Sequence, residues 1–193
     1  MGFLVWDKGI SVDECESIIN KYKDSEFAEG TAFISTIASF KNIKPQRKSP
    51  ICWIKENNIL VRSLFQFILE ANDSTFKYNV FNFSESMSHD AVQFTTYNKD
   101  DYYDWHQDIF TEDDPQCING LNRKISLTAN LSDPKSYEGG DLEFFGGEPG
   151  PTKIERTQGN VICFDSYTWH RVTPVTKGVR YSLVLWIWGP DFI

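Results

Sequence analysis

The chain has 193 residues, close to the usual size of one domain, and carries 19 Lys and Arg against 27 Asp and Glu, a net charge of −8. This acidic balance, without a basic run of five or more residues, argues against nucleic acid as a partner. No apolar stretch reaches the ~20 residues of a membrane span and the start MGFLVWDKG does not resemble a signal peptide, so we expect a single domain over residues 1–193, without a membrane partner and cytoplasmic.

Two helices are predicted in the first part of the chain. Ser11 and Glu14 form a capping box ahead of apolar residues at helical spacing in SVDECESIINKYK, which predicts a helix beginning after Ser11. The polar, proline-containing segment 41–50 indicates a loop. Residues 57–72 carry apolar side chains at steps of three and four, which predicts a second helix. We therefore interpret residues 1–90 as a helical support region.

From about residue 91 the pattern changes to short runs of β-branched and aromatic residues separated by turn sequences. The turns contain no helical crossover, so the strands are predicted to be antiparallel. The predicted strands are 91–97, 123–131, 141–145, 152–155, 160–164, 169–175 and 180–188. The fold class is therefore mainly β with flanking α-helices, and residues 91–190 are expected to form a sandwich or jelly-roll barrel.

The sequence DWHQDIF places a histidine and an aspartate two positions apart. In an extended segment, alternate residues point to the same side, so His106 and Asp108 would present an imidazole and a carboxylate together. An H-x-D pair is weak evidence alone, because chance often produces it. The irregular segment 109–122 follows directly and is either a lid or substrate loop or a plain surface loop.

A third candidate ligand is His170, which follows the strand VICFDS. Two histidines and one carboxylate leave about three positions open on an octahedral iron(II), the arrangement of mononuclear non-haem oxygenases. Zinc usually prefers a tetrahedral set. Taken by itself, an isolated histidine such as His170 is more often a hydrogen-bonded histidine near a barrel mouth than a metal ligand.

The strand RYSLVLWIW is almost wholly apolar but begins with Arg180, and a buried cation needs a partner. Strand alternation places Arg180 and Ser182 on one face, where they can bind one end of a dicarboxylate. The alternative is a structural salt bridge. Tyr97 either adds a hydrogen bond to the same carboxylate or serves packing. Trp186 and Trp188 share the parity of Arg180 and either line the pocket or fill the core.

The order H-x-D, a distant histidine and Arg-x-Ser ten residues later resembles the iron(II)- and 2-oxoglutarate-dependent dioxygenases. Within them, RKISLTANLSDPKSYEGGDLEFF and GNVICFDSYTWHRVTPVTKGVRYSLVLWIWGP closely resemble the PKHD-type hydroxylases of the prolyl 4-hydroxylase group. FLVWDKGISVDECESIINKY is similar to that group's first strand and helix. The resemblance covers about residues 91–190 and implies a double-stranded β-helix (jelly-roll) barrel as the catalytic core, supported by the N-terminal helices.

The resemblance also implies cofactors and roles. It implies Fe(II), 2-oxoglutarate as co-substrate and O2, and it allows ascorbate. As catalytic residues it implies the iron ligands His106, Asp108 and His170 together with Arg180 for the distal carboxylate of 2-oxoglutarate, with Ser182 and Tyr97 as helpers in co-substrate binding. Asn130 stands where some prolyl hydroxylases have a tyrosine that touches the co-substrate.

The expected function is hydroxylation of a prolyl or other residue in a peptide or protein, with release of succinate and CO2. The alternatives are 2-oxoglutarate-dependent oxidation of a small molecule, such as an amino acid or metabolite, and a non-catalytic jelly roll that binds a ligand. Segments 109–122 and 74–90 would discriminate, because a groove beside the metal favours a peptide and a closed cup favours a small molecule. The sequence does not indicate the oligomeric state.

Overall fold

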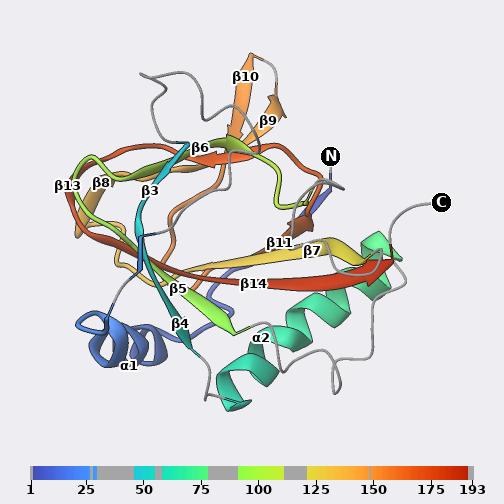
Figure 1. Cartoon of the computed structure of the whole chain (residues 1–193), viewed down its shortest axis with the longest axis horizontal. Coiled ribbons are helices and arrows are strands. Elements are labelled where there is room, and N and C mark those ends of the chain that lie inside the picture. The colour runs from blue at the N-terminus through green and yellow to red at the C-terminus, as the bar shows by residue number, and fades with distance from the viewer. Residues whose placement is uncertain are drawn as a thin grey trace.

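The computed structural model describes residues 2–26, 28–29, 46–54, 58–77, 91–110, 121–147 and 149–190. Two antiparallel β-sheets face each other (Figure 1). The larger sheet contains, in spatial order, β1 (Phe3–Trp6), β11 (Val161–Asp165), β7 (Leu121–Asn130), β14 (Arg180–Pro190), β5 (Val92–Tyr97), β4 (Pro50–Ile54) and β2 (Ala28–Glu29). The smaller sheet contains β10 (Gly150–Lys153), β9 (Leu142–Gly147), β12 (His170–Val172), β6 (Tyr102–His106) and β3 (Arg47–Lys48), and a separate pair is formed by β13 (Val175–Gly178) and β8 (Tyr137–Gly139).

The fold is mainly β with flanking α-helices, as predicted. Every strand pairing among the described residues is antiparallel, which confirms the prediction drawn from the turn sequences. The two facing sheets have the layered form of a jelly roll but do not close into one continuous barrel.

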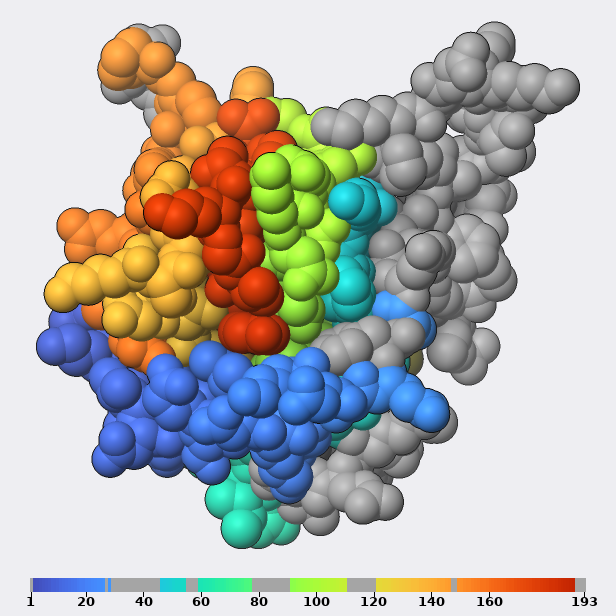
Figure 2. Space-filling view, turned by 90° about the vertical axis from the view of Figure 1, so that its left-hand side faces the viewer, coloured from blue at the N-terminus to red at the C-terminus, as the bar shows by residue number. Residues whose placement is uncertain are grey.

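The helices are α1 (Val12–Tyr22) and α2 (Asn58–Ala71), the latter continued by a π-helical turn, η1 (Asn72–Phe76). The predicted capping box is present: Glu14 donates its backbone N–H to the Ser11 hydroxyl at 3.3 Å, and the Glu14 carboxylate accepts the Ser11 N–H at 3.0 Å. Figure 2 shows the blue N-terminal part of the chain, which includes α1, lying across the lower end of the β-structure. None of the helices in the described ranges is long and apolar enough to cross a membrane.

The main hydrophobic core lies between the two helices and the larger sheet. Ile19 of α1 and Leu64 and Ile68 of α2 are buried together with Leu127 of β7 and Leu185 of β14. Fully burying one such side chain contributes about 1.5–3 kcal/mol. This packing holds the larger sheet as a rigid wall on which functional residues can be fixed.

The opposite face of the larger sheet is also buried, and it is apolar at β11 but polar along β7. Along β7, Leu127 and Ala129 belong to the helix-side core, whereas the alternate residues Ser126 and Thr128 face the smaller sheet, and all four are at most 9% exposed. A strand that is buried on both sides but polar on one predicts an interior that accommodates polar groups. The space between the two sheets is therefore the place to look for a site.

Two predictions about strands need correction. The predicted strand 169–175 is divided at Pro174, which has no N–H to donate, so β12 pairs with β6 and β9 while β13 pairs with β8. The segment 41–50, predicted as loop, contains β3, which pairs with β6. β4 was also not predicted, and it pairs with β5.

The two segments expected to distinguish a peptide groove from a closed cup were 109–122 and 74–90. Residues 111–120 and 78–90, the greater part of both segments, lie outside the described residues.

Candidate active site

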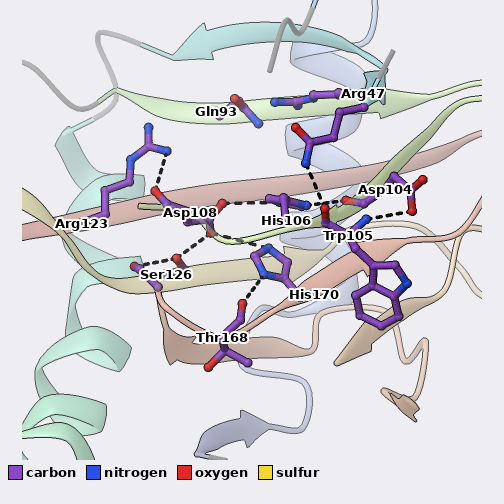
Figure 3. Close-up of polar contacts among 12 residues, drawn as sticks. Arg47, Gln93, Asp104, Trp105, His106, Asp108, Arg123, Ser126, Thr168 and His170 are labelled. Carbon is purple, nitrogen blue, oxygen red and sulfur yellow. Dashed lines mark hydrogen bonds and ion pairs between the residues drawn. The ribbon is translucent and has the colours of Figure 1, made fainter. Parts of the chain in front are cut away.

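Strand pairing brings the two histidines together. His106 ends β6 and His170 begins β12, and these two residues are direct partners in the antiparallel register. Asp108 follows two positions after His106, where its N–H donates to the Ser166 carbonyl at 2.9 Å. One potential ligand atom from each of His106, Asp108 and His170 lies within 4.8 Å of the others, and all three residues are buried. The convergence predicted from the sequence is present, and Figure 3 shows the cluster.

Backbone carbonyls select the tautomer of both imidazoles. The Nδ1 atom of His106 lies 2.7 Å from the Asp104 carbonyl oxygen, and that of His170 lies 2.9 Å from the Thr168 carbonyl oxygen (Figure 3). A carbonyl can only accept, so each Nδ1 carries a hydrogen, and in a neutral imidazole Nε2 then keeps its lone pair. This is the tautomer required of a ligand that binds through Nε2.

Asp108 lies between the two Nε2 atoms. Its Oδ1 is 3.5 Å from Nε2 of His106, and its Oδ2 is 3.6 Å from Nε2 of His170. Ligand atoms about 2.1 Å from one ion must lie within about 4.2 Å of one another, and both distances satisfy this limit. Ser126 donates its hydroxyl to Oδ2 at 2.6 Å and lies 2.9 Å from the Ser166 hydroxyl, which holds the carboxylate in place.

The electrostatics favour the charge states of a metal-binding set. Burial opposes the charged form of Asp108, but His170, His106 and Arg123 outweigh it and hold the pKa of this carboxyl well below its usual range. Burial, together with repulsion from His106, lowers the pKa of His170 to about 4, so its imidazole is neutral at pH 7. Neutral imidazole and ionised carboxylate are the forms that bind a metal.

Aromatic rings enclose the cluster. Tyr103 stacks on His106 with ring centroids 3.4 Å apart and planes 6° apart, and Phe164 meets His170 edge-on at 4.6 Å. Trp105, next to His106 in sequence, instead lies beneath the Arg171 guanidinium at 4.6 Å. Sequence reasoning missed Tyr103 and Phe164. Regular strand alternation would place Tyr103 and His106, three positions apart, on opposite faces. A register shift between β12 and β6 breaks this alternation, so the sequence did not indicate that the two rings meet.

A cavity joins the cluster to Arg180, and Ser182 and Tyr97 are among its lining residues. Arg180 is the register partner of Tyr97, and its guanidinium carbon lies 5.2 Å from the centre of that ring. Its Nη1 donates to the Ser182 hydroxyl at 3.3 Å. Thus the structure brings all six site residues predicted from the sequence around one cavity.

Arg180 is only 4% exposed, yet no carboxylate pairs with it in the part of the chain that the structure describes. The alternative reading, a structural salt bridge, therefore has no support among these residues. A buried guanidinium without an anionic partner is costly. A bound carboxylate would supply that partner through two parallel hydrogen bonds.

Asn130 lines a smaller cavity next to Arg180, and its side chain links the surrounding segments through hydrogen bonds. Its amide nitrogen donates to the carbonyls of Ser132 and Arg156 at 3.0 and 3.1 Å, and its amide oxygen accepts the Tyr137 hydroxyl at 3.3 Å. The side chain thereby ties together the turns at the Arg180 end of the cavity. Tyr137 also lines the smaller cavity next to Arg180.

The two tryptophans near the end of β14 have different surroundings. Trp186 lines the main cavity, whereas Trp188 stacks on Phe110 with ring centroids 5.2 Å apart. A register shift between Ile187 and Trp188 interrupts the alternation of the strand. Although Trp186 and Trp188 are two positions apart in one strand, they therefore do not share the same surroundings.

A buried set of two imidazoles and one carboxylate that leaves coordination positions open is typical of mononuclear non-haem iron(II) oxygenases. Residues 92–188, half of the chain, match the family model described as the 2OG-Fe(II) oxygenase superfamily, and the chain belongs to this superfamily.

Known proteins agree with this assignment. The PKHD-type hydroxylase YbiX of Escherichia coli O6:K15:H31 is 37% identical over 95 residues, which are 49% of this chain and 41% of the relative, so the match spans less than half of YbiX. The fold is similar to that of a Pseudomonas putida prolyl-4-hydroxylase, with a TM-score of 0.69, 19% identity and coverage of 96% of this chain and 91% of the other. It is also similar to a Trichoplax adhaerens prolyl hydroxylase in complex with a hypoxia inducible factor peptide fragment, with a TM-score of 0.68, 19% identity and coverage of 96% and 83%.

The Ser126 hydroxyl is expected to matter for metal affinity although it is not itself a ligand. Ser126→Ala removes the hydrogen bond that orients Asp108 and should weaken metal binding about 10–100-fold. Anaerobic titration of the metal-free protein with iron(II) measures this. Ser166→Ala is the matched control, because it removes a hydroxyl that contacts Ser126 but leaves the hydrogen bond from Ser126 to Asp108 intact. Equal affinities of Ser126→Ala and the unaltered protein would contradict the role of this bond.

Proposed function

We propose that this protein is an iron(II)- and 2-oxoglutarate-dependent hydroxylase that acts on a residue of a peptide or protein and releases succinate and CO2. The observation that carries the proposal is the buried His–Asp–His cluster in a cavity that also contains the buried guanidinium of Arg180, which has no carboxylate partner among the described residues. A metal site alone would not require Arg180. A dicarboxylate co-substrate accounts for both the metal-binding cluster at one end of the cavity and Arg180 at the other.

In this proposal His106, Asp108 and His170 hold the ferrous ion through two Nε2 atoms and a carboxylate oxygen. Arg180 binds the distal carboxylate of 2-oxoglutarate, and Ser182 orients the guanidinium through the contact between them. When bound, the ion, 2-oxoglutarate and O2 supply the oxidising chemistry, while the protein supplies position and a dry environment. The rings of Tyr103 and Phe164 exclude water from the imidazoles.

The substrate class is inferred from two sources. The sequence resembles the PKHD-type hydroxylases, and a protein of similar fold is a prolyl hydroxylase in complex with a peptide fragment. A prolyl side chain within a peptide is accordingly our first candidate for the hydroxylated group.

The test begins with protein freed of metal by a chelator. Adding iron(II), 2-oxoglutarate and a mixture of proline-containing peptides in air is expected to yield succinate, and omitting either iron(II) or 2-oxoglutarate should abolish it. Mass spectrometry of the peptides is expected to reveal a gain of one oxygen in the substrate. Failure to form succinate with every component present would refute the proposed activity, whereas succinate without any oxidised peptide would refute only the peptide substrate.

A further inference from the structure

The cavity extends along β5 away from Arg180. Gln93 lies four residues before Tyr97, the register partner of Arg180, which corresponds to about 13 Å along an extended strand. Arg47 of β3 and Trp186 of β14 line the same cavity as Gln93. None of these three residues has a part in the proposed metal and co-substrate sites. Figure 3 draws Arg47 and Gln93 on the same side of the His–Asp–His cluster.

The Arg47 guanidinium is held in a fixed position. Its Nε donates to the buried Ser49 hydroxyl at 2.7 Å, and its guanidinium carbon lies 4.9 Å from the centre of the Tyr103 ring, which in turn stacks on His106. The two terminal nitrogens of the guanidinium remain as donors. Within the described ranges, no carboxylate forms an ion pair with Arg47. A cation is therefore fixed next to the metal ligands, and the described residues supply no anion for it.

Gln93 and Trp186 add further donors to this wall. Gln93 is 3% exposed and donates one N–H to the Thr95 hydroxyl at 2.8 Å, which leaves its second N–H for another acceptor. Trp186 is the register partner of Ser126, and its buried Nε1–H has no acceptor among the described residues. Unsatisfied buried donors are uncommon in native proteins. A wall of donors favours a ligand group that only accepts.

We propose that Arg47 and Gln93 bind a carboxylate group of the substrate and so place the neighbouring carbon atoms beside the His–Asp–His cluster. This inference rests on the proposed function. The charged residues that line the cavity are Arg47, Asp108 and Arg180. With a divalent ion and dianionic 2-oxoglutarate bound, one positive charge remains, and one substrate carboxylate balances it. The guanidinium fork also matches a carboxylate in shape.

The carboxylate could belong to a small free acid or to an acidic side chain in a peptide. To test the subsite without turnover, the protein is loaded with zinc, which has no redox chemistry, and with 2-oxoglutarate. Ligand-observed NMR then gives dissociation constants for N-acetyl-L-proline and N-acetyl-L-alanine, for their uncharged amides, and for end-capped Gly-Pro-Asp and Gly-Pro-Asn peptides. Carboxylate probes are expected to bind at least about tenfold more tightly than their amide counterparts. If the free acids bind more tightly than the Asp peptide, the carboxylate belongs to a small acid. If the Asp peptide binds more tightly, it belongs to an acidic side chain of a peptide.

The variant Arg47→Gln should weaken carboxylate binding at least about tenfold and leave amide binding unchanged. Arg62→Gln, which removes the same charge from an exposed position on α2, is the matched control and should behave as the unaltered protein. Equal binding of acids and amides, no binding of any carboxylate probe, or a loss of 2-oxoglutarate binding in Arg47→Gln would overturn the subsite. Failure of 2-oxoglutarate to bind the unaltered protein would instead overturn the proposed function itself.

Discussion

Asp108→Ala is expected to abolish iron-dependent succinate formation and to weaken metal binding by more than about 100-fold. The basis is geometric: the two carboxylate oxygens lie 3.5 and 3.6 Å from the Nε2 atoms of His106 and His170, so this residue supplies the only anionic donor of the set. Loss of an outer partner of a ligand already costs about 10–100-fold in affinity, and loss of the ligand itself should cost more. Anaerobic iron(II) titration and a succinate assay measure the two effects separately.

The control for this prediction is Asp104→Ala. Asp104 is an exposed aspartate two positions before His106, and its side chain accepts a hydrogen bond from the Trp105 N–H, while its backbone carbonyl holds His106 and is unaffected by the substitution. Both variants should retain the circular dichroism spectrum of the folded protein. If Asp108→Ala kept iron(II) affinity and turnover while remaining folded, the carboxylate would not belong to the metal site.

Two parts of the candidate site were predictable from short-range signals, whereas His170 joins them only through strand pairing. An H-x-D pair in an extended segment places its side chains together whatever the rest of the fold does. Arg180 was informative for a different reason: a cation at the start of an apolar strand must be compensated, and the residues described here contain no carboxylate that does so. In both cases a local pattern determined what the residue could do.

The surroundings of the site could not be predicted because long-range pairing creates them. Arg47 lies in a polar segment without strand periodicity, and its two-residue strand exists only because it pairs with Tyr103 and Tyr102 of β6. Likewise Ser126 reaches Asp108 only through the packing of β7 next to the loop that follows β6. Neither contact leaves a trace in the spacing of residues along the chain.

The inner face of the larger sheet connects fold and function. Residues of alternate parity on β5, β7 and β14 pack against the helices as an apolar layer, while Gln93, Ser126, Thr128, Arg180 and Ser182 face the cavity although each is at most 9% exposed. Burying so many polar groups is unfavourable unless they are compensated. The apolar core between this sheet and the helices supplies the stability that permits this burial. The site therefore depends on a core that contributes none of the candidate ligands.

Arg180→Ala is expected to weaken 2-oxoglutarate binding at least about 100-fold, since a hydrogen bond to a charged group contributes about 1.5–3 kcal/mol and a guanidinium can form two. Isothermal titration of the zinc-loaded protein gives the affinity, and the apparent requirement for 2-oxoglutarate in the succinate assay should rise in parallel. Metal affinity should be unchanged, because Arg180 belongs to the other end of the cavity. Ser182→Ala should have a smaller effect, as the hydroxyl only positions the guanidinium at 3.3 Å.

The decisive comparison uses 2-oxobutyrate, which has the keto acid end of 2-oxoglutarate but lacks the distal carboxylate. If Arg180 recognises that carboxylate, the unaltered protein should prefer 2-oxoglutarate strongly, and Arg180→Ala should bind the two acids with nearly equal affinity. The interaction is thus isolated from any general disturbance of the cavity, which would weaken both ligands together. If the variant still preferred 2-oxoglutarate as strongly as the unaltered protein does, another residue would hold the distal carboxylate, and the buried charge of Arg180 would need a different explanation.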